Sequence, residues 1–277
     1  MRKPDDQDVR DWTEFEARLE ALRRDEISAR RTVDFLFRGL DNSAWPLATT
    51  LERAGREGMA ASAHYATVSR AHPQIESFTR TKWAIRLPPD VDTWLRRGGA
   101  WDALRFPTQE EYSYMVHLRH HGFPSPLLDW TRSPYIAAFF AFRSETGPPG
   151  GNVSICVFSE TPCQCKSRRN GEPQIRRMGP YVTTHRRHFL QQSDYTMCGI
   201  FKKKWHFAKH EDVFVNGNPN QHVLWRFNIP WIPWTERLKV LKLLDSYSLN
   251  AFSLFGSEES LMETLAFREL GSRGEGS

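Results

Sequence analysis

The sequence predicts an α+β fold, with a single compact domain in which helices flank a central mixed or antiparallel sheet. Helical patterns dominate its first half, and short β-branched or aromatic runs are spread along the chain without strict alternation of strand and helix. With 277 residues, of which 39% are hydrophobic and 13% aromatic, the chain is too apolar to be disordered. One large core is therefore expected.

The N-terminal part combines helical patterns with one strand. Residues 12–31 place tryptophan, phenylalanine and leucine at three- and four-residue spacing among alternating charges, which predicts an amphipathic helix. The run "TVDFLFRG" at 32–39 is β-branched and aromatic and predicts a strand. A helix is expected from near Thr49, and residues 59–85 are expected to form two helices separated at Pro73.

The middle of the chain carries clear helix boundaries. Thr108 is a suitable N-cap, two glutamates follow it in the first turn, and Gly122 suits the position after the helix end. A proline turn at 124–126 and a short extended piece come next. They lead into a strongly apolar helix capped by Thr131 or Ser133.

The second half predicts strands first and helices last. The runs "NVSICVFS" (152–159) and "QHVLWRFNIP" (221–230) predict strands, and the basic segments between them are expected to be loop with one or two short strands. An amphipathic helix with Thr235 as its N-cap is expected next, then an extended piece at 252–255 and a final helix capped by Ser257.

Several functional classes are excluded. No window approaches the roughly 18–20 uninterrupted apolar residues of a membrane span, and the N-terminal residues lack the apolar run of a signal peptide. We therefore expect a cytoplasmic protein without a membrane partner. The sequence contains no Gly-x-Ser-x-Gly elbow, no P-loop and no zinc-protease helix. These absences argue against ordinary serine hydrolases, P-loop enzymes and zincins.

The cysteines indicate a reduced compartment and no metal site. Their number and spacing do not suggest a disulfide framework. A Cys-x-Cys pair needs two more ligands for zinc, and the nearest histidines are spaced more closely than in a zinc finger. The residues concerned are Cys156, Cys163, Cys165 and Cys198, with His185 and His188.

The net charge of +5 and the pI near 9.1 suggest an acidic partner. The excess is concentrated in the basic segment 166–210, which encloses an aromatic and glutamine-bearing stretch. Such a segment suits nucleic-acid phosphates with stacking platforms for bases. A solvated basic loop is the alternative.

Arg38 and Gly39 form a candidate anion clamp at the end of a buried strand. A guanidinium grips phosphate or carboxylate through two parallel hydrogen bonds, and a glycine lets a ligand approach the backbone. The alternative is purely structural: the arginine pairs with Asp34 or Asp129, and the glycine starts a turn.

A second candidate cluster lies in "HHGFPSPLLDWTRSP", residues 120–134. His120 and His121 point about 100° apart if both are helical, so only one is expected to face a site and the other to pack or cap. Asp129 lies among apolar residues and needs a partner, since an unpaired buried carboxylate is unfavourable. The candidates are Arg38, Arg132 and the two histidines.

Together the two motifs closely resemble the FRG domain, a mainly bacterial family named for its Phe-Arg-Gly. Its second signature has the form His-His-Gly-x-Pro-Thr-x-Leu-Leu-Asp-Trp-Thr-x-Ser-Pro. The residues that match are Phe37, Arg38, Gly39, Trp45, Leu47, His120, His121, Gly122, Pro124, Leu127 to Thr131, Ser133 and Pro134.

The resemblance implies how the chain is divided. We expect an N-terminal helical extension at 1–31, an FRG domain at 32–270 and a flexible tail at 271–277. Two later segments are similar to further blocks of the family. Their polar members would be Gln191 or Gln192, and Glu258 or Glu259.

The order of motifs is also similar to that of ADP-ribosyltransferases, which implies NAD as the ligand and a role in bacterial defence or toxin systems. By this analogy Arg38 and Gly39 bind the pyrophosphate, and Thr131 with one histidine of the pair, His120 or His121, orients ribose or nicotinamide. Glu258 or Glu211 stabilises the oxocarbenium character that develops as nicotinamide departs.

Two other functions stay open. In the first, a clamp of Arg38, His121, Asp129 and Gln192 recognises a nucleotide or a nucleic-acid end without turnover. In the second, the protein is a nuclease or another hydrolase.

Overall fold

A computed structural model describes residues 5–28, 34–97, 106–149, 151–160, 171–214 and 222–271. Its strands are β1 (Asp5–Asp8), β2 (Phe35–Leu40), β3 (Leu127–Thr131), β4 (Asn152–Glu160), β5 (Gln174–Arg177), β6 (Ser193–Lys202), β7 (Lys204–Phe207) and β8 (His222–Pro230). Its helices are α1 (Trp12–Ser28), α2 (Thr50–Arg53), α3 (Ala61–Thr79), α4 (Pro88–Arg97), α6 (Gln109–His120), α7 (Pro134–Phe142), α8 (Arg186–Leu190), α9 (Leu238–Ser246), α10 (Ala251–Phe255) and α11 (Glu258–Leu270). Two short helical turns, η2 (His210–Val213) and η3 (Pro233–Arg237), complete the described elements.

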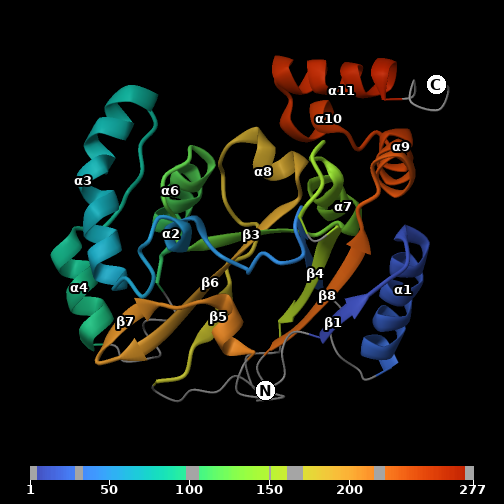
Figure 1. Ribbon diagram of the computed structural model, residues 1–277. Coiled ribbons are helices and arrows are strands. Elements are labelled where there is room, and N and C mark those ends of the chain that lie inside the picture. Colours follow the sequence, from blue (N-terminus) through green and yellow to red (C-terminus); the bar gives the residue numbers. More distant parts are fainter. Residues whose placement is uncertain are drawn as a thin grey trace.

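The described strands form one sheet in the order β1-β8-β4-β2-β3-β6-β5, with β7 paired to β6. Only β1 and β8 run parallel, and the other pairs are antiparallel. Helices flank the sheet: α1 lies beside β1 and β8 at one end, and α3 and α4 lie beside β7 at the other (Figure 1). The predicted α+β class with a mixed or antiparallel sheet flanked by helices is confirmed, and the sheet is mixed and mostly antiparallel.

Alternation along β2 divides the core between the two faces of the sheet. Phe35 and Phe37 pack with α1, α7 and α9, whereas Leu36 and Leu40 belong to a separate cluster on the opposite face. Arg38 follows the same alternation and extends from the face of Leu36. A third cluster fills the space between α3, α4 and α6 and strands β3, β6 and β7.

The sheet is weakest in its middle, between β2 and β3. These neighbours share one paired position, Phe37 opposite Thr131, whereas β2 pairs with β4 along its whole length, from Phe35 to Leu40. The backbone from Arg38 onward is therefore not paired with β3. This opening in the sheet positions the candidate site.

Gly39 has a packing function. A Cβ added there would lie 1.9 Å from the carbonyl oxygen of Ala137 and 2.8 Å from the backbone nitrogen of Ala141. The alanine-rich helix α7 therefore approaches the sheet closely, and this approach depends on Gly39. Gly39 lies within β2 and starts no turn.

Several boundaries follow the sequence. Thr108 with Glu111 forms a capping box on α6, Ser133 rather than Thr131 caps α7, and Ser257 caps α11. Thr49 caps α2. Local side-chain chemistry determined these ends, which is why the sequence alone identified them.

Three expectations about local structure were wrong. Helix α3 continues through Pro73, because His72 and Ile75 on either side of the proline pack into the core. Residues 251–255 are helical, since Asn250 provides a capping box. Thr235 lies inside η3, which leads directly into α9, so it is not an N-cap.

Two buried histidines predict a loss of stability in acid. Burial lowers the pKa of His64 to about 4 and that of His210 to about 3, below the ordinary value of 6.5. Between pH 6.5 and these folded-state pKa values, the unfolded chain binds more protons than the native one. Stability should therefore fall as the pH drops through this window, by about 1.4 kcal/mol per pH unit for each histidine.

Urea unfolding across this pH range tests the expectation. His64→Gln, whose amide can still donate to the carbonyl of Pro124, should remove the share of His64 from the slope. An identical pH slope in wild type and variant would contradict the assignment.

Candidate functional site

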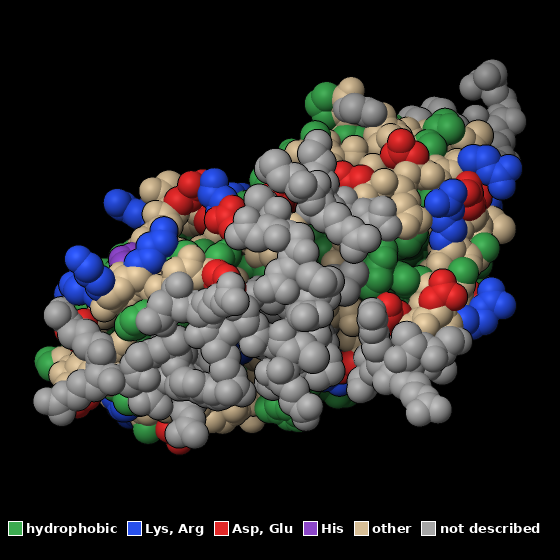
Figure 2. Space-filling model, turned by 90° about the horizontal axis from the view of Figure 1, so that it is seen from below, with side chains coloured by type: hydrophobic (Ala, Val, Ile, Leu, Met, Phe, Trp, Pro, Cys, Tyr) green, Lys and Arg blue, Asp and Glu red, His purple; other side chains and the backbone are tan. Residues whose placement is uncertain are grey.

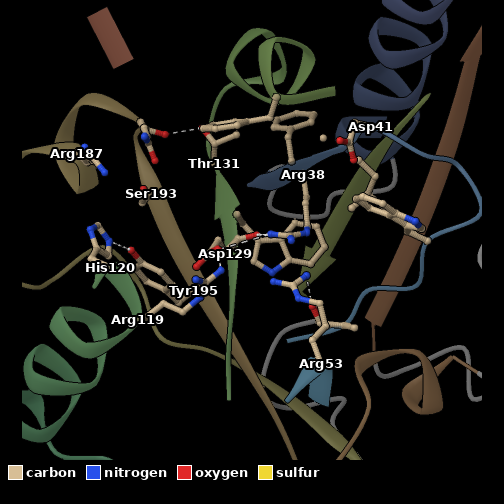
Figure 3. A pocket seen from close by; sticks show the side chains of 18 of the residues that line it. Arg38, Asp41, Arg53, Arg119, His120, Asp129, Thr131, Arg187, Ser193 and Tyr195 are labelled. Atoms are coloured by element: carbon tan, nitrogen blue, oxygen red, sulfur yellow. Dashed lines mark hydrogen bonds and ion pairs between the residues drawn. The ribbon is translucent and has the colours of Figure 1, made fainter. Parts of the chain in front are cut away.

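A pocket of about 770 Å³ lies at the opening between β2 and β3. Its walls come from β2, the loop at 41–48, α2, the end of α6, β3, α7, α8, the start of β6 and α10. Figure 3 shows the polar side chains that gather there. Segments far apart in the sequence therefore build one site.

Four arginines are among the described residues that line the pocket: Arg38, Arg53, Arg119 and Arg187. They come from β2, α2, α6 and α8. The described carboxylates in the lining are those of Asp41 and Asp129. With four guanidinium groups against two carboxylates, the pocket favours an anionic ligand.

Arg38 is held in place by Asp129. Its Nη1 donates to the backbone oxygen of Asp129 at 2.8 Å and lies 3.8 Å from the carboxylate Oδ2. Arg119 Nη2 donates to the same Oδ2. Figure 3 shows Arg38 and Arg119 pointing toward Asp129. Asp129 thus holds two arginines in place, and Arg38 and Arg119 are the partners that its carboxylate needs.

The arginines are not fully satisfied by the protein. The Nε atoms of Arg38, Arg119 and Arg187 are buried and have no hydrogen-bond acceptor in the described part of the chain. Burial lowers the pKa of Arg38, and the Asp129 carboxylate opposes this shift. Because these Nε atoms are inaccessible, an anion in the pocket would be bound by the other guanidinium nitrogens.

His120 joins a chain of neutral side chains on one wall. Its Nε2 lies 2.7 Å from the Tyr195 hydroxyl, and His188 Nδ1 lies 3.4 Å from the same oxygen. His188 Nε2 lies 3.2 Å from the carbonyl of Pro180, an acceptor, so Nε2 carries the proton and Nδ1 accepts from Tyr195. His120 then donates to Tyr195. Burial lowers the pKa of His120 to about 4, which keeps it neutral at pH 7.

Thr131 also lines the pocket, but its hydroxyl is engaged. It donates to the carbonyl of Gln191 at 2.8 Å and accepts from the backbone nitrogen of Ser133 at 3.2 Å. Gln191 lines the pocket as well, and its amide donates to the carbonyl of Leu254. These groups shape the wall by fixing β3 against α8 and α10.

The aromatic part of the lining includes Trp45, Phe140 and Phe255. The rings of Phe140 and Phe255 lie 5.9 Å apart and nearly perpendicular. Arg187 lies over Phe255, with 5.5 Å between its guanidinium carbon and the ring centroid. Trp45 is 50% exposed and lies on the loop at 41–48. A planar base can stack on such surfaces.

Four residues proposed from the sequence do not line this pocket: His121, Gln192, Glu211 and Glu258. His121 is the exposed C-cap of α6, and its ring contacts that of His117, with 4.4 Å between ring centroids and a tilt of 43°. The structure thus places His120 at the pocket and His121 at the end of the helix. Gln192 is exposed, and its carbonyl accepts from the backbone of Arg132.

The two predicted catalytic glutamates have other surroundings. Glu258 is exposed in the first turn of α11. Glu211 accepts from the backbone nitrogen of Leu47 at 3.0 Å and from Arg226 Nη2 at 3.1 Å. Arg226 in turn donates to the carbonyl of Ser43. Glu211 therefore holds the loop at 41–48 in place without lining the pocket.

The basic segment 166–210 does not form one surface in its described part. Arg177 is bound to Asp194 and Asp34, Arg187 faces the pocket, and the exposed Lys202–Lys204 lie where β6 turns into β7. The face in Figure 2 also shows basic side chains interspersed with acidic ones over its described atoms.

The structure bears on the metal and membrane expectations only through its described residues. Cys163 and Cys165 lie outside them, and Cys156 and Cys198 are buried free thiols. Within the described ranges, no cluster of histidine, cysteine or acidic side chains has the arrangement to hold a metal ion. None of the described helices combines the length and apolar character needed to cross a membrane.

The pocket contains the two motifs on which the family resemblance rested. Arg38 and Gly39 come from the first, and His120, Asp129, Trp130 and Thr131 come from the second. A family model for the FRG domain matches residues 33–148. The chain contains an FRG domain. Neither the curated proteins nor the solved structures compared with the chain include a significant match.

The FRG match stops before the pocket is complete. Arg187, Gln191 and Tyr195 lie beyond residue 148 and still line the pocket formed by the FRG motifs. The prediction that the domain runs to residue 270 stays a prediction. The shared pocket is consistent with it.

Sequence reasoning missed several residues of the site. Arg53, Arg119 and Arg187 lie on helices where an arginine is ordinarily a solvated charge, and no local pattern distinguishes them. Asp41 follows the first FRG motif by two residues, so proximity to that motif was the available signal.

Proposed function

We propose that the pocket at the β2–β3 opening binds a nucleotide that carries two or more phosphates, with NAD as the leading candidate. The excess of arginine over carboxylate in one pocket is the observation that carries this proposal. Guanidinium groups bind phosphate oxygens through charge-assisted hydrogen bonds. A volume of about 770 Å³ lies within the usual range for small-molecule sites.

The arrangement suggests how such a ligand lies. Arg38 and Arg119 are already fixed by Asp129, which reduces the entropy lost when they bind phosphate oxygens. Arg187 approaches from α8 and supplies a further cation. Trp45 at the rim supplies a surface for a base.

ADP-ribosyl transfer from NAD is the reaction that we propose for this site. It breaks the bond between ribose C1′ and the nicotinamide nitrogen, and nicotinamide leaves with the bonding electrons while an acceptor bonds to C1′. A carboxylate near C1′ would stabilise the positive charge that develops. Since Glu211 and Glu258 do not line the pocket, they do not support this step. Nucleotide binding is therefore the better supported part of the proposal.

Calorimetric titration with NAD, ADP and inorganic pyrophosphate tests the binding. Wild type should bind all three, and Arg187→Ala should weaken each by about tenfold, because one charge-assisted contact is removed. Arg70→Ala on α3 is the matched control and should leave binding unchanged, since Arg70 is exposed and lies outside the pocket. Failure of all three ligands to bind would contradict nucleotide binding.

Nicotinamide release from labelled NAD tests the reaction separately. Release above the uncatalysed rate, with label on an added protein or nucleic-acid acceptor, is the expected result. Binding of NAD without release would refute transfer under the acceptors used and leave nucleotide binding in place.

Nucleic-acid binding is a second candidate, favoured by Lys202, Lys203 and Lys204. These consecutive lysines are exposed at the β6–β7 turn, and φ of Lys203 is +60°. Changing all three to alanine should weaken binding of single-stranded nucleic acid and reduce the slope of log K against log salt by about two to three. Filter binding at several salt concentrations measures both, and unchanged binding would remove this candidate.

A further inference from the structure

We propose that Asp41 accepts a hydrogen bond from a ribose hydroxyl of the bound nucleotide, so that the pocket prefers ribonucleotides to their 2′,3′-dideoxy analogues. This inference rests on the proposed nucleotide binding and names the class of nucleotide.

Asp129 and Asp41 have opposite surroundings. The Asp129 carboxylate is occupied by Arg119 and lies near Arg38. Asp41 also lines the pocket and is half-buried, yet it forms no hydrogen bond or ion pair with any described residue. In Figure 3 the two aspartates appear on opposite sides of Arg38. Asp41 is therefore a carboxylate with acceptor capacity to offer a ligand.

The backbone holds Asp41 in position. It directly follows Leu40, the buried last residue of β2. The loop that it begins is fastened by the hydrogen bond from Arg226 to the Ser43 carbonyl and by the contact of Glu211 with the Leu47 backbone. A carboxylate on an anchored loop can specify a ligand group, because little conformational freedom is lost on binding.

The chemistry of Asp41 selects a hydroxyl as its partner. A carboxylate repels phosphate, so it does not serve the anionic part of the ligand. The four arginines that line the same pocket disfavour a metal cation. A neutral donor is left, and in a nucleotide the ribose 2′- and 3′-hydroxyls are neutral donors attached directly to the phosphate-bearing sugar.

The experiment compares ADP, 2′,3′-dideoxy-ADP and inorganic pyrophosphate by calorimetry in EDTA, which removes divalent cations. Wild type should bind ADP at least about tenfold more tightly than dideoxy-ADP, the effect expected of a hydrogen bond to a charged group. Asp41→Ala should bind both nucleotides equally. It should bind pyrophosphate as tightly as wild type or more tightly, because a negative charge has been removed from the pocket.

Asp25→Ala is the matched control, since Asp25 is exposed on α1 and does not line the pocket. It should retain the full preference for ADP. Equal binding of ADP and dideoxy-ADP by wild type would overturn the ribose contact while leaving nucleotide binding intact. A preference that survives in Asp41→Ala would show that another group reads the sugar. If neither nucleotide nor pyrophosphate binds wild type, the proposed function itself fails.

Discussion

Arg38→Ala is expected to weaken ADP binding by about 100-fold, which corresponds to roughly 3 kcal/mol. Arg38 lies on β2 at the opening of the sheet, and its side chain is only 16% exposed. The substitution removes a largely buried cation and leaves the backbone oxygen of Asp129 without this donor. Calorimetric titration with ADP measures the loss.

The control separates binding from folding. Arg38→Lys keeps the charge but not the planar fork, so it should recover only part of the affinity. Both variants should unfold in urea cooperatively, because Arg119 still pairs with Asp129. If Arg38→Ala folds and binds ADP as wild type does, Arg38 is not a phosphate ligand.

Gly39→Ala is expected to destabilise the protein by at least about 3 kcal/mol and to lower Tm by roughly 10 °C or prevent soluble expression. The added Cβ would overlap the backbone of α7 at Ala137 and Ala141. Backbone cannot rotate aside as a side chain can, so the helix must move away from β2. That movement would separate Phe37 from the residues of α7 with which it shares a core.

Gly55→Ala is the matched control for this substitution. Gly55 has φ of +71° but has nothing within 4 Å of an added Cβ. Its cost should be only that of the backbone conformation, about 1 kcal/mol. Thermal unfolding followed by circular dichroism compares the two variants. Similar Tm values would show that α7 does not depend on Gly39.

Glu211 illustrates what sequence order cannot tell. It lies downstream of the two motifs, where an analogous catalytic acid was expected, yet its carboxylate binds Leu47 and Arg226 behind the pocket loop. Position along the chain says which residues are available. It does not say which side of a loop a side chain reaches.

The paired histidines show the opposite case. Helical geometry alone separated the directions of His120 and His121, and the structure places the first in the pocket and the second at the helix end. His120 faces the pocket and forms a hydrogen bond with the hydroxyl of Tyr195. Tyr195 lies on β6, 75 residues further along the chain. That Tyr195 is the partner of His120 follows from the tertiary structure and could not be predicted from the local sequence.

The sequence by itself determined the α+β class, the strand that carries Arg38, the capped starts of α6 and α11, and the pairing of two motifs in one site. Hydrophobic period, capping chemistry and short motifs are local, so they can be found along one chain. Only the tertiary structure decided that β2 and β3 separate after Phe37 and that Arg53, Arg119 and Arg187 converge there. Those arginines lie on different elements, and their meeting depends on how the sheet and helices pack, which no local pattern records.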